Sequence, residues 1–260
     1  MGTPRTDWAA IPLDAGHRPW PLPDRRWVMT MSWQDLLFAH WPIEAGRIAA
    51  RLPPDLAVDT FEGRAWLSVV PFRMADVGAR GLPRLPWVSA FPELNIRTYV
   101  VAGGKPGVWF FSLDAASRLA VWGARAFFHV PYYHAAMHCA PGGGDSVAYR
   151  SRRTDPRLGP GDLVARYWPT GDVFRAPPGT LDHWLSERYC LYGADRHGRV
   201  YRGDVHHAAW PLQPAAADIA VNTAADAHGF GDLGPPAILH FARRLDVVAW
   251  WPVPVDPAQG

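Results

Sequence analysis

The chain has one lysine among its 26 basic residues, and all the others are arginine. Chemistry that needs an amine side chain therefore has a single candidate, Lys105. Lys105 lies in the segment GGKPG at residues 103–107, which is typical of a tight hairpin connection with exposed side chains. We therefore expect no buried lysine nucleophile.

Cysteine is also scarce, since Cys139 and Cys190 are the only two in 260 residues. This count excludes a disulfide-dense scaffold and favours reduced thiols. The net charge is only +2, which excludes a dedicated nucleic-acid surface with a concentrated basic stripe. The densest basic cluster, Arg150, Arg152 and Arg153, is interpreted as a solvated turn.

Long hydrophobic runs are absent as well. No apolar stretch approaches the ~20 residues that a membrane-spanning helix needs. Proline and charge interrupt residues 1–26, unlike a signal peptide. We expect a cytoplasmic protein with no membrane partner. The hydrophobic content of 48% and aromatic content of 13% exclude a disordered chain and predict a large packed core.

Short strands separated by turns dominate the remaining pattern, with 27 prolines and 24 glycines as punctuation. Helical composition is confined to a few segments, of which residues 115–128 form the longest. We predict an N-terminal arm at residues 1–26 and a single domain at residues 27–260. Its class is α+β and mainly β, with an antiparallel sheet curled into a barrel or a sandwich.

Residues 93–101 alternate in polarity, which is the pattern of a β-strand with two unlike faces. Glu93, Asn95, Arg97 and Tyr99 share the polar face. In one interpretation this face meets water, as on many curled sheets. In the other it lines a barrel lumen, where carboxylate and guanidinium limit each other's desolvation cost. A lumen of the second kind would bind a small polar ligand.

Two histidine pairs are candidates for chemistry. His134 and His138 would share one face of a helix, but Ala135 stands where a helical zinc-hydrolase motif has glutamate, and no third ligand is near. We therefore favour ordinary histidines and predict no metal and no cofactor. His206 and His207 point to opposite faces if the chain is extended, so at most one lies inside, as a general acid or base or as a hydrogen-bonded core residue.

Seven sequence blocks carry a resemblance. They are FAHWPIEAGRIAARLPPDL, FEGRAWLSVVPFRM, FPELNIRTYV, GKPGVWFFSLDA, ARAFFHVPYYHAAM, LSERYCLY and VHHAAWPLQ. Their combination and order are similar to the YqjF-like family of uncharacterised proteins over roughly residues 28–250. That family resembles a distant branch of the acetoacetate decarboxylase superfamily. The resemblance implies a closed or conical β-barrel with an internal cavity and a few flanking helices, but it implies no particular reaction.

The resemblance also bears on single residues. In decarboxylases of that superfamily a buried lysine forms a Schiff base with a keto acid, and this lysine follows a proline in a block similar to ARAFFHVPYY. Here the corresponding positions hold Tyr132 and Tyr133. Glu93 matches an acidic residue of the family's cavity. Imine-based decarboxylation is therefore not expected.

These observations favour a small-molecule enzyme that performs acid–base chemistry of the dehydratase, lyase, isomerase or cyclase type on a carbonyl or carboxylate compound. A non-catalytic binding protein with the same cavity is the alternative, and a scaffold with a filled lumen is a third interpretation. The small-molecule ligand is the expected partner, and a homo-oligomer stays open. The catalytic candidates are Glu93, Arg97, Tyr132 and Tyr133, and the substrate-binding candidates are Asn95, Tyr99, Arg125, Arg188 and His206.

Overall fold

Thirteen strands in the described part of the chain hydrogen-bond into one continuous sheet. The computed structural model describes residues 8–11, 14–82 and 89–255. Its strands are β1 (Met29–Ile43), β2 (Ala57–Val58), β3 (Ala65–Ala79), β4 (Phe91–Ala102), β5 (Lys105–Ala115), β6 (Tyr132–Pro141), β7 (Val147–Arg153), β8 (Asp162–Pro169), β9 (Cys190–Ala194), β10 (Val200–His207), β11 (Gln213–Asn222), β12 (Ile238–Ala249) and β13 (Val253–Pro254). The helices are α1 (Ala45–Ala49), α2 (Arg118–Phe127), α3 (Leu181–Ser186) and the 3-10 turn η2 (Asp226–His228).

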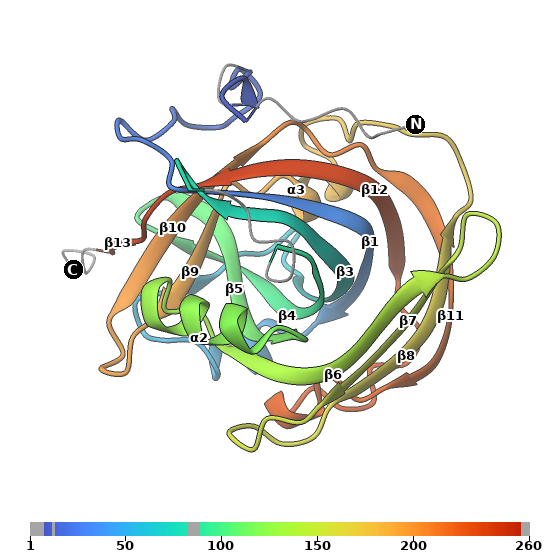
Figure 1. Cartoon of the computed structure of the whole chain (residues 1–260). Coiled ribbons are helices and arrows are strands. Elements are labelled where there is room, and N and C mark those ends of the chain that lie inside the picture. The colour runs from blue at the N-terminus through green and yellow to red at the C-terminus, as the bar shows by residue number, and fades with distance from the viewer. Residues whose placement is uncertain (1–7, 12–13, 83–88, 256–260) are drawn as a thin grey trace.

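The sheet closes on itself in two rings that share β12, β1, β3, β4 and β5. The first ring is completed by β9 and β10, and the second ring by β6, β7, β8 and β11 (Figure 1). The rings separate because β5 changes partner along its length, pairing with β9 at residues 108–109 and with β6 at residues 113–115. Both of these pairings are parallel, so the barrel is mixed rather than wholly antiparallel. The prediction of a closed, mainly β barrel with few helices is confirmed.

The shared strands are buried on both faces because each face belongs to a different ring. In β4, Leu94 and Ile96 pack into the hydrophobic cluster that includes Tyr149 of β7 and Leu163 of β8. The alternate residues Glu93 and Asn95 face the ring that β9 and β10 complete. A strand with a polar face is thus placed where neither face reaches bulk water, and its polar groups must find partners inside the protein.

The basic cluster on β7 is not the solvated turn that its composition predicts. Arg150 and Arg152 are exposed, but strand alternation sends Arg153 inward, where it is 5% exposed. Its Nε lies 2.8 Å from Oδ1 of Asp114 on β5, and its Nη2 lies 3.2 Å from Oγ of Ser112. Arg153 therefore joins β7 to β5 across the second ring as a buried ion pair.

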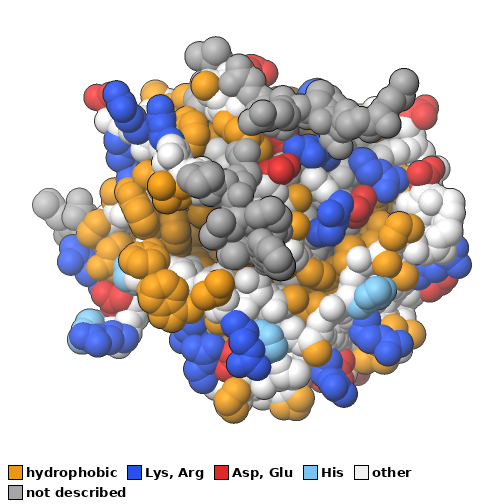
Figure 2. Space-filling model, in the orientation of Figure 1, with side chains coloured by type: hydrophobic (Ala, Val, Ile, Leu, Met, Phe, Trp, Pro, Cys, Tyr) orange, Lys and Arg blue, Asp and Glu red, His pale blue; other side chains and the backbone are white. Residues whose placement is uncertain are grey.

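Helix α2 crosses between β5 and β6 and covers one side of the first ring (Figure 1). Ser117 caps its N-terminus by accepting a hydrogen bond from the amide of Ala120, at 3.3 Å. Its inner face includes Val121, which is buried, while hydrophobic side chains including Trp122 and Phe127 gather on its outer face (Figure 2). The helical prediction for residues 115–128 agrees with α2.

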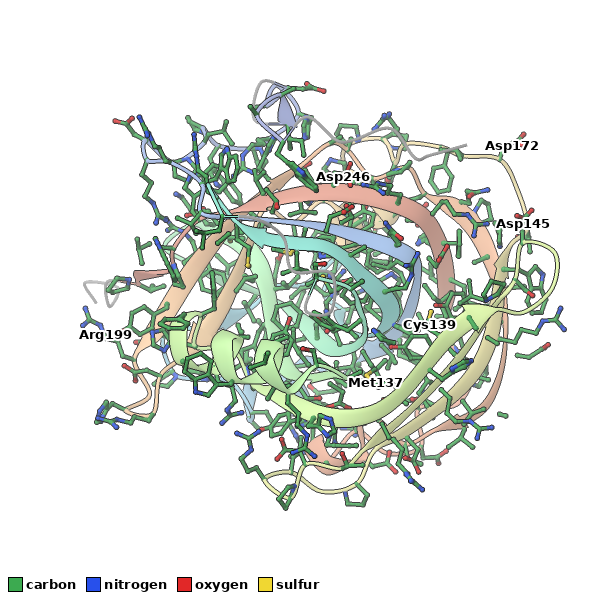
Figure 3. The ribbon with its side chains drawn as sticks, viewed as in Figure 1. Met137, Cys139, Asp145, Asp172, Arg199 and Asp246 are labelled. Atoms are coloured by element: carbon green, nitrogen blue, oxygen red, sulfur yellow. The ribbon has the colours of Figure 1, made fainter. Side chains whose placement is uncertain are left out.

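The described part of the arm packs against β10. Arg18 is 8% exposed, donates to the carbonyl of Val205 at 2.6 Å, and lies 4.8 Å from the ring centroid of Tyr189. The two cysteines are free thiols on separate strands, Cys139 on β6 (Figure 3) and Cys190 on β9. None of the described helices has both the length and the apolar character needed to cross a bilayer.

Candidate functional site

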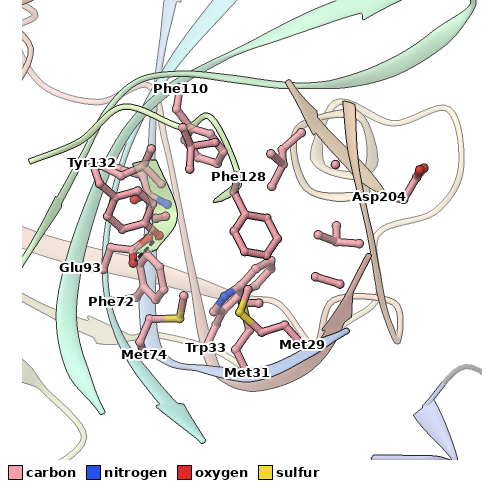
Figure 4. Close-up of a pocket in the computed structure, with 18 of the residues that line it drawn as sticks. Met29, Met31, Trp33, Phe72, Met74, Glu93, Phe110, Phe128, Tyr132 and Asp204 are labelled. Atoms are coloured by element: carbon pink, nitrogen blue, oxygen red, sulfur yellow. Dashed lines mark hydrogen bonds between the residues drawn. The ribbon is translucent and has the colours of Figure 1, made fainter. Parts of the chain in front are cut away.

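A cavity of about 110 Å³ lies inside the ring that β9 and β10 complete (Figure 4). Most of its wall is apolar, and Glu93, Asn95 and Tyr132 supply polar groups on one side. Asp204 also belongs to the wall, but its carboxylate is directed away from the cavity and lies 3.5 Å from Nε of Arg202. An apolar cavity of about 150 Å³ accommodates benzene. The volume here therefore suits a ligand portion of about five heavy atoms.

Glu93 and Tyr132 form the polar centre of this wall. Strand alternation directs Glu93 inward from β4, and the parallel pairing of β5 with β6 brings Tyr132 beside it. The Tyr132 hydroxyl donates to Oε2 of Glu93 at 2.8 Å. From the second ring, the hydroxyl of Tyr149 donates to the backbone carbonyl of Glu93 at 2.6 Å. Glu93 is therefore fixed at both its backbone and its carboxyl group.

Burial governs the protonation of this pair. Glu93 is 1% exposed, and loss of solvation raises its pKa from 4.5 to about 8, although hydrogen bonds from Tyr132 and Asn95 act in the opposite sense. Burial and the neighbouring Glu93 raise the pKa of Tyr132 well above its usual value, so this phenol keeps its proton. Glu93 can thus hold or release a proton near neutral pH while Tyr132 remains a donor.

A smaller chamber of about 50 Å³ adjoins the cavity. Arg97, Arg188 and His207 line it. Six residues line both spaces, namely Trp33, Phe72, Asn95, Phe110, Leu191 and Val205. The two chambers therefore lie side by side in one lumen, with the carboxyl group of Glu93 in the larger and the guanidinium groups in the smaller.

The structure thus brings five of the nine predicted site residues to one lumen, namely Glu93, Asn95, Arg97, Tyr132 and Arg188. Tyr133 and Arg125 lie elsewhere, and their predicted places in the cavity are corrected. Alternation along β6 turns Tyr133 to the outside, with the Arg125 guanidinium 5.5 Å from its ring centroid. Arg125 donates to the backbone carbonyl of Tyr132 at 3.0 Å, so it supports Tyr132 from behind.

Tyr99 and His206 are corrected in the same way. Tyr99 follows Arg97 on the same face of β4 but is fully buried and lines neither chamber. Its hydroxyl donates to the carbonyl of Leu185 at 2.9 Å. His206 faces the arm, where its Nδ1 lies 3.3 Å from a guanidinium nitrogen of Arg18. His207 takes the cavity side instead, and burial lowers its pKa. Strand periodicity places one of the two histidines inside, but it does not say which one.

Trp33 is a site residue that is not among the candidates predicted from the sequence. Its indole lines both chambers, and its buried Nε1 has no acceptor among the described residues. Met29 and Met31 precede it on the same face of β1 and line the larger chamber. The alternation of Met29, Met31 and Trp33 along β1 is the sequence signal for this wall, and it differs from the other candidate patterns in being apolar.

The lysine and the paired histidines lie outside this lumen. Lys105 begins β5, is half-buried, and has its Nζ 5.7 Å from the ring centroid of Trp20. His134 and His138 lie on the strand β6, so the helical zinc spacing does not apply to them. Within residues 8–11, 14–82 and 89–255, no group of three or more His, Cys, Asp or Glu side chains is arranged to hold a metal ion.

The profile of the DUF2071 family, described as an uncharacterized conserved protein, matches residues 30–246. The chain belongs to the DUF2071 family. Within it, the uncharacterized protein YqjF of Bacillus subtilis (strain 168) is 46% identical over 229 residues, which cover 88% of this chain and 93% of YqjF. The predicted membership of the YqjF-like family is confirmed.

Solved structures similar to this DUF2071 chain share the acetoacetate decarboxylase fold. An acetoacetate decarboxylase-like enzyme from Sphingomonas wittichii RW1 has a TM-score of 0.62 at 14% identity, covering 93% of this chain and 98% of that one. The enduracididine biosynthesis enzyme MppR has a TM-score of 0.59 at 12% identity, covering 89% and 90%. Acetoacetate decarboxylase from Legionella pneumophila has a TM-score of 0.56 at 12% identity, covering 100% of both chains. At these identities the likeness establishes the fold.

Proposed function

We propose that this DUF2071 protein is a small-molecule enzyme that transfers protons to and from a carbonyl or carboxylate compound, without an imine. The observation that carries the proposal is the buried Glu93 carboxyl group, which is held by Tyr132 in the wall of a cavity. A carboxyl group with a pKa near the working pH is suited to act as both general acid and general base. The similar structures include enzymes, among them MppR with pyruvate bound, which supports a small oxo compound as ligand.

An enolisation illustrates the chemistry that this wall can perform. In its carboxylate form, Glu93 removes a proton from the carbon beside a carbonyl group. The electron pair of the C–H bond forms the C=C bond, and the carbonyl π pair moves to oxygen. The indole N–H of Trp33, which has no acceptor among the described residues, supports donation to that oxygen. Neutral Glu93 then returns the proton to carbon, or to a leaving oxygen in a dehydration.

The position of the lysine supports a mechanism without a Schiff base. Lys105 lines neither chamber, and its Nζ lies over Trp20 near the start of β5. By resemblance, Tyr132 lies in the block where the decarboxylases have their Schiff-base lysine. Its hydroxyl donates a hydrogen bond to Glu93. A nucleophilic amine is thus replaced by a proton donor, and the step proposed here forms no covalent bond to the protein.

The test is hydrogen–deuterium exchange at carbon. Small oxo acids and hydroxy acids are incubated with the protein in D₂O and followed by NMR. We expect protein-dependent deuterium incorporation beside the carbonyl group or formation of a product. We also expect no mass increase on Lys105 after borohydride treatment. Saturable binding without exchange would favour the alternative of a non-catalytic binding protein, and a borohydride adduct on Lys105 would refute the mechanism without an imine.

The raised pKa of Glu93 also predicts how stability depends on pH. The folded state holds the proton up to a pH of about 8, whereas the unfolded chain releases it near 4.5. The stability associated with the neutral carboxyl group is therefore complete below pH 4.5 and is lost as the pH rises to about 8, by at most about 1.4 kcal/mol per pH unit. Urea unfolding of the wild type and Glu93→Gln from pH 4 to 9 checks this. The variant should gain stability relative to the wild type across that window, and parallel curves would contradict the expectation.

A further inference from the structure

The smaller chamber contains two buried guanidinium groups, and a carboxylate pairs with one of them. Arg97 is 8% exposed, and its Nε and Nη2 have no acceptor among the described residues. Arg188 is 7% exposed, and its Nη2 likewise has none among them. The carboxylate of Asp59 accepts from Nη1 of Arg188 at 2.6 Å. No salt bridge to Arg97 forms within the described part of the chain.

This arrangement destabilises the folded protein unless an anion binds in the chamber. A buried charge without a partner loses its solvation, and two neighbouring guanidinium groups also repel each other. Burial lowers the pKa of Arg188, and the charge of Arg97 acts in the same direction. The Arg97 guanidinium lies 4.9 Å from the ring centroid of Phe38, which offsets part of the cost but accepts no N–H. The unused donors and the volume of about 50 Å³ together suit one carboxylate group.

The distance between this chamber and Glu93 sets the length of the ligand. Glu93 and Arg97 are four residues apart on β4, a Cα separation of about 13 Å in an extended strand. The Arg97 guanidinium approaches Phe38 and the ring of Tyr99, which lies still farther along the strand from Glu93. With a hydrogen bond of about 3 Å at each end, about 7 Å remains for the ligand. An extended chain covers that length in about six bonds.

The wall between the two ends favours an unbranched apolar chain. Phe72, Phe110, Leu191 and Val205 line both chambers and form most of the shared wall. Asn95 is the polar residue of β4 at the junction, halfway between Glu93 and Arg97. The lumen thus has guanidinium groups at one end, an apolar wall in the middle and the Glu93 carboxyl group at the other end. A ligand with a polar group at each end and methylene groups between them matches this order.

We propose that the lumen binds an extended monocarboxylate whose acid group pairs with Arg97 and Arg188 and whose carbonyl oxygen lies four to six carbons away, beside Glu93 and Tyr132. This inference rests on the proposed function for the role of Glu93, but the carboxylate site itself does not. It distinguishes the ligand from 2-oxo and 3-oxo acids, in which the acid and carbonyl groups are too close together to reach both chambers.

Calorimetric titration of the wild-type protein with a graded series of oxo acids tests the proposal. The probes are pyruvate, 4-oxopentanoate, 5-oxohexanoate and 6-oxoheptanoate, with 5-oxohexanamide to remove the charge. We expect the 5-oxo or 6-oxo acid to bind about 10- to 100-fold more tightly than pyruvate, and the amide to lose that gain. Equal affinity across the series, or equal affinity of amide and acid, would overturn the proposal.

Variants locate the acid group. Arg97→Gln and Arg188→Gln are each expected to weaken binding of the longer acids by about tenfold or more and to leave binding of the amide unchanged. Arg118→Gln, at an exposed arginine on α2, is the matched control and should have no effect. If either variant fails to fold, the series on the wild-type protein decides alone. If affinity depends on chain length but no deuterium exchange occurs, the carboxylate site stands and the proposed reaction is refuted. If exchange occurs but affinity does not depend on chain length, the reaction stands and the carboxylate site is refuted.

Discussion

Glu93→Gln is expected to lower the rate of protein-dependent proton exchange by about 10²- to 10⁴-fold, the usual contribution of a positioned general acid–base group. Glutamine has the shape of the neutral carboxyl group that burial favours, and its amide oxygen can still accept the hydrogen bond from Tyr132. The fold should therefore survive, and the loss should appear in the chemical step. The measurement is the rate of deuterium incorporation at saturating ligand.

The pH profile makes this result specific to Glu93. Because exchange begins with Glu93 in its carboxylate form, its rate should rise with pH up to about 8, where wild-type Glu93 ionises, and level off above it. Tyr132→Phe removes a hydrogen bond that lowers the pKa of Glu93, so it should move this limb to higher pH. Glu44→Gln, at the exposed N-cap of α1, is the control and should leave rate and profile unchanged. Exchange by Glu93→Gln at the wild-type rate would rule out the assignment.

The second large effect is an increase in stability on replacing a functional arginine. Arg97→Met should stabilise the ligand-free protein by about 1–3 kcal/mol, because it removes a buried charge that lacks a carboxylate partner in the described structure. That gain corresponds to a rise of several degrees in the midpoint of thermal unfolding, at about 2–4 °C per kcal/mol for a chain of this size. The same variant should lose binding of carboxylates, which would show that the charge is retained for function.

Arg188→Met provides the contrasting case. Arg188 has a partner, so its removal leaves Asp59 without the guanidinium group that lies 2.6 Å away. It also removes the hydrogen bond of Nε to the carbonyl of Trp184, at 2.7 Å. We expect Arg188→Met to lower the unfolding midpoint while Arg97→Met raises it. Thermal unfolding by circular dichroism measures both, and a decrease for both variants would show that Arg97 is a structural residue.

The resemblance supplied the pair Tyr132 and Tyr133, and alternation predicted that one of His206 and His207 lies inside, but neither decided which member of its pair faces the lumen. Tyr132 and Tyr133 are adjacent on β6, and His206 and His207 are adjacent on β10, so one member of each pair faces inward. The direction depends on how β6 pairs with β5 and how β10 pairs with β12, and the pattern of a single strand does not contain that pairing. A strand pattern is symmetric with respect to its two faces until a neighbouring strand sets the register.

Contacts between distant segments could not be predicted from the sequence for a related reason. Three arginines in four residues predict a solvated turn at Arg153, and nothing near it in the sequence indicates Asp114, 39 residues earlier. Arg125 is predicted from the sequence to bind substrate, yet α2 presents it to the outer side of β6. Whether a charged residue is buried depends on the partner that it meets in the folded protein, and this partner comes from another strand or helix.

The sequence by itself determined the strand at residues 93–101, its polar face, the lack of an available amine and the membership of a barrel family. These are local patterns or compositional facts, and they need no knowledge of long-range packing. Only the tertiary structure decided that both faces of β4 are buried, that Glu93 meets Tyr132, and that Arg97 lies in a separate chamber with Arg188. The reason is physical: burial, which raises the pKa of Glu93 and leaves Arg97 without an acceptor among the described residues, arises when two rings close around shared strands.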